Sequence, residues 1–310
     1  MITESTAPPE PIDESKATMP ETGPLYWSVR RELWENRSIY LAPLIVGGVA
    51  LFGFAINAIG LPDRRRSLLL LDPPEQRAHI VGSYENTALI IMLTAFLVGV
   101  FYCLDALYGE RRDSSILFWK SMPVSDLTTV AAKLSIPLVL LPLITFAIIE
   151  VTFLIMMLMS TAVLLPSGLA ATTWTVLPFF QLSVILLYAL ATMALWQAPI
   201  FGWLLLVSGW ARRATFLWAV LPWLAVCALE WIAFNTSHVA ALLGHRVTGS
   251  FAEAFVDFSH PEGAHAPVVD RLTQLAPLKF LSSPWLWIGL VVAVIFFAAA
   301  VRLRRYRGPL

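Results

Sequence analysis

The feature that most constrains this chain is a long stretch without charge. From Val151 to Trp210 the sequence contains no Asp, Glu, Lys or Arg. A soluble protein cannot build a water-facing surface from such a segment, whereas a lipid bilayer can accommodate it. The whole chain is 58% hydrophobic and 14% charged, against about 25% charged residues in soluble domains. We therefore expect an integral membrane protein that contacts the lipid bilayer and does not bind nucleic acid.

Hydropathy divides the chain into six candidate transmembrane helices, since a span needs about 20 apolar residues. The fold class expected is all-α and polytopic. The predicted spans run approximately over residues 40–60, 84–107, 134–159, 176–206, 216–234 and 285–301. The fourth is ambiguous, because the uncharged run continues from Trp174 to Trp210, which is too long for one straight span and too short for two. We expect Pro199 to kink this helix or to end it near the interface.

The distribution of Lys and Arg over the connecting segments predicts the orientation. With a cytoplasmic N-terminus, 14 of these residues lie on the cytoplasmic side and 7 on the outer side. We therefore expect both termini in the cytoplasm of a cell with a cytoplasmic (inner) membrane. The triplet Arg64–Arg66 lies on the predicted outer side and opposes the rule, and the sequence offers no explanation for it.

Two segments outside the spans have structure of their own in this interpretation. Residues 25–38 form an amphipathic helix that we expect to lie in the cytoplasmic interface, or else to extend the first span. Its apolar arc includes Trp27 and Trp34, with Arg31 and Glu32 on the polar face opposite. The long connection between the fifth and sixth spans, 235–283, is expected to form a structured extracytoplasmic loop of short helices. Residues 1–24 read as a disordered cytoplasmic tail, which leaves 25–310 as the membrane domain.

Catalytic and cofactor motifs are absent from the sequence. There is no G-x-x-x-x-G-K-[ST] loop for ATP, no H-E-x-x-H and no G-x-S-x-G. The five His residues have no standard ligand spacing, although four of them share the loop 235–283. We therefore expect no catalytic, cofactor or metal site, and a protein that is not an enzyme. Any ATP hydrolysis would take place on a separate chain.

The most informative segment is the predicted cytoplasmic loop between the second and third spans. Charges of both signs at Glu110–Asp113 precede an apolar cluster, Ile116–Trp119, and a Met-Pro-Val turn. Ser125 is placed to cap the helix that follows. An apolar patch rimmed by charges suits docking into a partner's cleft, and a short interfacial helix resting on lipid is the alternative.

This loop resembles the signature of the ABC-2-type permeases, the membrane subunits of type V-like ABC exporters. That signature reads Glu-basic-x-x-Gly-Thr, an apolar run, Pro-Val, and a basic residue about ten positions later. The matching residues here are Glu110, Arg111, the run Ile116–Trp119, Pro123, Val124 and Lys133. The chain departs from the pattern at Ser114-Ser115, where Gly-Thr is commoner.

The resemblance implies a permease subunit that exports a hydrophobic or amphipathic substrate by alternating access. It also implies two partners, a second permease subunit and an ATP-binding cassette ATPase, with Glu110–Val124 as the coupling loop. Within that loop Phe118 and Trp119 are the expected anchors, because aromatic residues usually dominate interface energies. Glu110 and Arg111 are expected either at the charged rim or as residues that hold the loop in shape.

Glu150 lies deep in the third span, where a charged side chain costs about 3 kcal/mol on insertion scales. Such residues usually face a bundle interior, a partner or water, so Glu150 is a candidate for the substrate path. A hydrogen-bonded packing role is the alternative. Two other function classes stay open, a membrane-embedded enzyme and an ion-coupled secondary transporter. The first lacks converging catalytic residues in the sequence, and the second lacks visible inverted repeats.

Overall fold

The computed structural model describes residues 22–117, 124–256, 269 and 271–306. Within these residues the protein is helical, with one isolated antiparallel bridge between Phe255 and Leu275 and no longer strand. Six helices are long and apolar enough to cross a membrane. The protein is therefore an all-α, multi-pass membrane protein, as the hydropathy predicted.

The helices of the bundle follow in chain order with short connections. The N-terminal half contains α1 (Thr22–Glu35), α2 (Ser38–Ala58), α3 (Leu61–Leu68), α4 (Pro73–Ala106), α5 (Tyr108–Arg112) and α7 (Asp126–Ser135). A π-helical turn, η2 (Ile136–Leu140), then leads into α8 (Leu141–Leu164), and a 3-10 turn, η3 (Leu165–Ser167), follows. The remainder contains α9 (Ala171–Val176), α10 (Phe179–Trp210), α11 (Thr215–Phe234), α12 (His238–Ala254), η5 (Leu272–Gln274), α13 (Pro277–Ser282) and α14 (Pro284–Tyr306).

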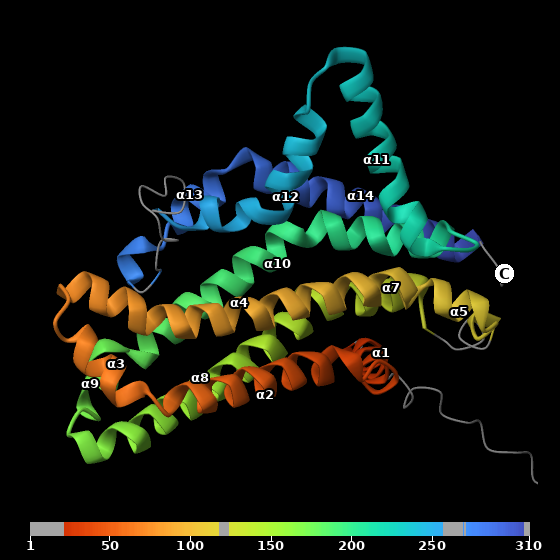
Figure 1. Ribbon diagram of the computed structural model, residues 1–310. Helices are drawn as coiled ribbons and strands as arrows, with labels where there is room; N and C mark the ends of the chain where they lie inside the picture. The colour runs from red at the N-terminus through yellow and green to blue at the C-terminus, as the bar shows by residue number, and fades with distance from the viewer. Residues whose placement is uncertain (1–21, 118–123, 257–268, 270, 307–310) are drawn as a thin grey trace, which may run out of the picture.

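Helix α10 lies at the centre of the arrangement, with α14 on one side and α4 and α8 on the other (Figure 1). Its contact with α14 is close because the facing residues are small. A methyl group added at Gly202 would lie 3.4 Å from the Ala293 carbonyl oxygen. In a bilayer, where helices gain little from leaving lipid, small residues allow the close van der Waals packing that holds helices together.

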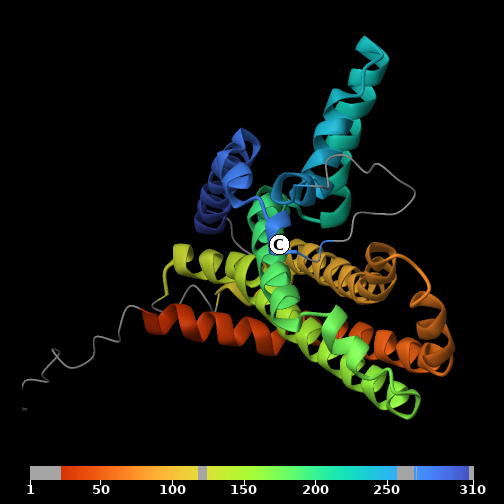
Figure 2. The same cartoon turned by 90° about the vertical axis from the view of Figure 1, so that its left-hand side faces the viewer.

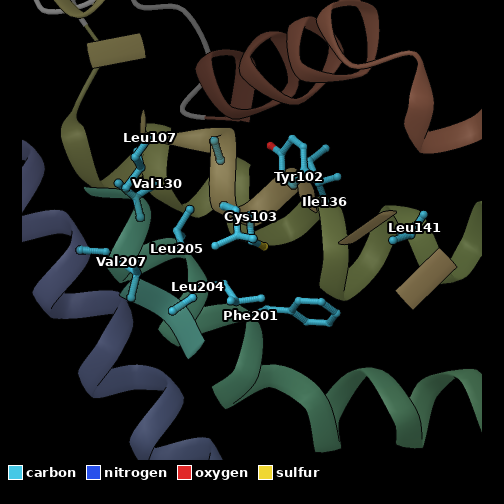
Figure 3. Packing of buried hydrophobic residues seen from close by; sticks show 14 of the residues in the cluster. Tyr102, Cys103, Leu107, Val130, Ile136, Leu141, Phe201, Leu204, Leu205 and Val207 are labelled. Atoms are coloured by element: carbon cyan, nitrogen blue, oxygen red, sulfur yellow. The ribbon is translucent and has the colours of Figure 1, made fainter. Parts of the chain in front are cut away.

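The largest buried cluster joins α4, α7, α10 and the turn η2 near one end of the bundle (Figure 3). It includes Tyr102, Cys103, Ile136, Phe201 and Leu205. Helix α11, by contrast, extends away from the other helices in both views of the whole chain (Figures 1 and 2). Only 6% of the most apolar window of α11 is buried, so nearly all of this helix is available to lipid or to another chain.

Three boundaries differ from the sequence-based expectation. Helix α1 begins at Thr22, so the last residues of the predicted 1–24 tail are helical, while residues 1–21 lie outside the described part of the chain. Helix α4 begins at Pro73, well before the predicted start of the second span, because its first turns are too polar to register in hydropathy. Helix α10 runs unbroken through Pro199 to Trp210, so the prediction that this proline ends the helix is wrong.

The connection between α11 and α14 is folded in its described parts, as predicted. Helix α12 packs on α10, and its Arg246 guanidinium lies 4.7 Å from the Trp196 ring centroid. Arg246 also donates a 2.9 Å hydrogen bond to the Trp285 carbonyl. Burial lowers the pKa of Arg246 to about 10, so the side chain remains a cation at neutral pH and the stacking is a cation–π contact.

Candidate functional site: a buried ionic cluster at the loop ends

The predicted coupling loop begins with a buried carboxylate. Glu110, on the short helix α5, is 8% exposed. Its Oε1 lies 3.2 Å from Arg31 of α1 and 3.2 Å from Lys133 of α7, and its Oε2 lies 3.2 Å from Arg304 of α14. One carboxylate thus binds three helices that are far apart in the sequence. Glu110 is therefore not a rim residue but one that holds the loop in place.

A second buried carboxylate, Glu32 of α1, shares two of these cations. It is 2% exposed, and its Oε1 lies 2.7 Å from Lys133 Nζ and 2.9 Å from Arg31. Its Oε2 accepts a 2.8 Å hydrogen bond from the Tyr102 hydroxyl. Burial on its own raises the pKa of Glu32, but the attraction of Lys133, followed by that of Arg31, outweighs it and holds the pKa below its usual value. Glu32 is therefore ionised at neutral pH.

The charges of this group, which we call the loop-end cluster, are balanced. Asp126, at the start of α7, completes it through a 3.5 Å contact with Arg304. The cluster contains the cations Arg31, Lys133 and Arg304 and the anions Glu32, Glu110 and Asp126. Buried ions are tolerated when each has partners of opposite charge, and removing one partner is strongly destabilising. The cluster therefore joins α1, both ends of the loop and the C-terminal helix into one unit.

Figure 1 shows these elements together at one end of the molecule, with α1, α5 and the C-terminus on the same side. The end of α4 is also attached to α10 there. Ser208 Oγ accepts hydrogen bonds from the backbone N–H groups of Leu107 (2.8 Å) and Tyr108 (2.9 Å). Arg111 is 5% exposed and donates to the carbonyls of Gly209 (2.7 Å) and Ala211 (3.1 Å). Arg111 thus positions the loop through the C-terminal end of α10.

The loop itself is described as far as Leu117 and again from Val124. Within the predicted exposed apolar cluster, Ile116 is 2% exposed and Leu117 is 60% exposed, so Ile116 belongs to the core and not to a docking surface. Phe118, Trp119 and Pro123 lie outside the described residues, and their roles stay predictions. Val124 is half-buried.

Two serines of the loop act through the backbone. Ser114 has a φ of 58°, the left-handed region that glycine enters without steric cost. Ser125 caps α7 as predicted, and its side chain accepts a 3.0 Å hydrogen bond from the Thr128 N–H.

Glu150, the candidate for the substrate path, is half-buried on α8. Its Oε2 accepts a 2.8 Å hydrogen bond from Ser183 Oγ of α10, while its buried Oε1 has no partner among the described residues. One turn further along α8, Phe153 lines an apolar cavity of about 320 Å³ between α4, α8, α10 and α12, with Glu85 and Asn86 at its polar part. Glu150 thus lies near this cavity, and the geometry is compatible with either a packing role or a transport role.

Two other polar groups have structural explanations. Glu230, near the end of α11, accepts hydrogen bonds from the backbone N–H groups of His238 (2.7 Å) and Val239 (2.8 Å). It therefore caps α12. His245 packs against Trp196 and Trp285, and within the described residues no group of three or more His, Cys, Asp or Glu side chains could hold a metal ion.

The sequence-based reasoning missed Glu32, Tyr102 and Arg304 as members of the site. The helical wheel placed Glu32 on the polar face of α1 correctly, but that face is turned into the bundle. The aromatic face is the exposed one, with Trp27 59% and Trp34 69% exposed. The available signal was an acidic residue on an interfacial helix close to a basic residue at the start of a span, although such pairs are too common to identify the partners.

Comparisons with known proteins do not assign the chain to a family. It matches no family model, no curated protein and no solved structure.

Proposed function

We propose that this chain is the transmembrane permease subunit of an ATP-driven exporter of the ABC-2 type. It moves a hydrophobic or amphipathic substrate outward by alternating access, powered by a separate ATP-binding subunit. A second permease subunit completes the translocation path, and the exposed helix α11 is a surface available to it. Both termini and the Glu110–Val124 loop face the cytoplasm in this proposal.

The observation that carries the proposal is the loop-end cluster. A permease without its own ATPase has to receive its conformational change through a contact, and the receiving segment has to be rigidly attached to the helices that move. The cluster provides that attachment, because Glu110 and Lys133, on either side of the loop, are both bound to α1, and Glu110 also contacts α14. A displacement of the loop is therefore transmitted directly to α1, α7 and α14.

The departure of this chain from the family signature also supports the resemblance. Ser114 occupies the position where Gly is commoner and has the left-handed φ that favours glycine. At the next position, where Thr is commoner, the Ser115 hydroxyl keeps the hydrogen-bonding group and donates 3.4 Å to the Glu110 carbonyl. The backbone shape that the signature demands is thus maintained.

The test combines a double substitution in the loop with a measurement of ATPase binding. The chain is co-expressed with the ATPase encoded beside it, and Phe118→Ala with Trp119→Ala is compared with the wild type. Loss of aromatic anchors typically costs about 2 kcal/mol, or roughly thirtyfold in affinity. The double variant should insert normally, co-purify weakly with the ATPase and show reduced transport-stimulated ATP hydrolysis.

A matched control is Leu70→Ala, since Leu70 is 87% exposed and follows α3 at the opposite end of the bundle. It should bind the ATPase like the wild type. Full ATPase binding and turnover by the loop variant would refute the assignment of the coupling loop. The orientation is checked separately with single cysteines at Ser114 and Ser167 in a background without Cys103 and Cys227. An impermeant maleimide applied to intact cells should label position 167 and not position 114.

A further inference from the structure

The triplet Arg64–Arg66, which opposes the charge rule, is resolved by the structure into three different environments. Arg64 is exposed and donates to the Asn57 side chain and carbonyl at the end of α2. Arg66 is 63% exposed and pairs with Asp63 at 3.5 Å. Arg65 is only 3% exposed. The first and third are ordinary surface or capping residues, and Arg65 needs another explanation.

Arg65 is a buried cation without compensation in the described chain. Its Nε and Nη1 atoms are buried and have no hydrogen-bond partner, and it forms no ion pair with a described carboxylate. Burial lowers the pKa of the Arg65 guanidinium, yet a guanidinium remains protonated in proteins. An unpaired buried charge is costly, so a group that binds Arg65 would stabilise this region.

Arg65 lines a pocket with room for such a group. The pocket has a volume of about 260 Å³ and lies between α2, α3, α4 and α8, at the end opposite the loop-end cluster. A single water needs only about 10–15 Å³ of such space, so a multi-atom ligand fits. The rim is exposed and polar, formed by Asn57, Arg64, Ser67, His79 and Ser83.

The floor of the pocket combines hydrogen-bond donors with apolar walls. The buried Tyr84 hydroxyl lies near both Ser160 and Arg65. Phe54, Leu68 and Ile80 supply apolar surface. None of the residues that line the pocket is acidic. A guanidinium fork beside hydroxyl donors, with no competing carboxylate, favours an oxyanion such as phosphate.

We propose that this pocket binds one phosphate group, with Arg65 as its main ligand and Tyr84 as a second donor. The phosphate comes either from the headgroup of an anionic lipid or from a free phosphate ion. This inference depends on the pocket alone and is independent of the proposed transport function.

The experiment measures anion binding to the purified full-length protein in phosphate-free detergent. In one arm, inorganic phosphate is titrated at constant ionic strength and the melting temperature is followed. In the other, native mass spectrometry counts phosphatidylglycerol molecules retained per protein, with phosphatidylcholine as the zwitterionic reference. We expect one saturable site in at least one arm. Binding in the lipid arm alone identifies a headgroup, and binding in the phosphate arm alone identifies a free ion.

The substitutions separate the pocket from general surface charge. Loss of charge-assisted hydrogen bonds in Arg65→Gln should weaken binding roughly tenfold to a hundredfold. The neighbouring Arg66→Gln removes the same charge from an exposed position and should stay within about twofold of the wild type. Tyr84→Phe removes only a hydroxyl and should weaken binding severalfold, so it carries the test if Arg65→Gln does not fold.

The proposal is overturned if the wild type shows no saturable site in either arm. It is also overturned if Arg65→Gln, or Tyr84→Phe in its place, binds like the wild type. Equal losses in Arg65→Gln and Arg66→Gln would likewise reject it, because they would indicate unspecific attraction to the triplet.

Discussion

Lys133→Met tests whether the loop-end cluster holds the cytoplasmic end of the bundle together. Methionine approximates the volume of the lysine stem without its charge, so packing is largely preserved. The substitution removes an ammonium that lies 2.7 Å from Glu32 Oε1 and 3.2 Å from Glu110 Oε1. Lys133 is 3% exposed, so water cannot replace it.

The magnitude follows from what remains around the two carboxylates. Breaking a buried ion pair by removing one partner costs about 3–5 kcal/mol. Here Arg31 still lies 2.9 Å from Glu32 and 3.2 Å from Glu110, and Arg304 still contacts Glu110. These cations moderate the loss, and we expect about 3 kcal/mol, or roughly a hundredfold change in the folding equilibrium constant.

A double substitution separates charge from packing. In Lys133→Met with Glu32→Gln the cluster retains two cations and two anions, so its charge is balanced again. This variant should be more stable than the sum of the two single effects, with a coupling energy of about 1 kcal/mol or more. The exposed pair of Arg112 and Asp113, whose side chains are 55% and 62% exposed, provides the control. Arg112→Gln should leave stability unchanged.

The assay is reversible unfolding of the purified protein by titration of a denaturing detergent, followed by Trp fluorescence. Lys133→Met should shift the midpoint clearly, and Arg112→Gln should not. If Lys133→Met unfolds within about 0.5 kcal/mol of the wild type, as ordinary surface substitutions do, the cluster does not hold the loop ends. An additive double variant would show that the carboxylates and Lys133 act independently.

Three further predictions concern single residues. Because the folded-state pKa of Glu32 lies below its usual value, the stability that its charge contributes is fully present at neutral pH and is lost as pH falls from about 4.5 through the folded-state value; the acid limb of a stability–pH curve should therefore be shallower in Glu32→Gln. If Glu150 lines the substrate path, Glu150→Gln should impair transport in a reconstituted assay while Ser183→Ala has a smaller effect, and equal transport by all three proteins would assign Glu150 to packing. Ser114→Gly should stabilise the protein by about 1 kcal/mol in the detergent titration, since glycine enters the left-handed region without cost, and a destabilised variant would contradict the observed φ.

The sequence by itself determined where the chain crosses the membrane. A bilayer requires about 20 apolar residues per span regardless of neighbours, so hydropathy located all six spans, and only their polar extensions escaped it. The start of α7 was equally predictable, because a capping serine bonds to an N–H three residues away. Both signals are local and need no knowledge of the partner helices.

Only the tertiary structure decided which charged residues are buried together. Glu32 and Lys133 lie 101 positions apart, and nothing in either segment indicates the other. The same holds for the arginine triplet, where consecutive residues point in different directions along α3 and only Arg65 enters the bundle. A charged side chain is buried or exposed according to what packs against it. That is settled by helix packing and not by composition, and so the candidate sites of this protein became visible only in three dimensions.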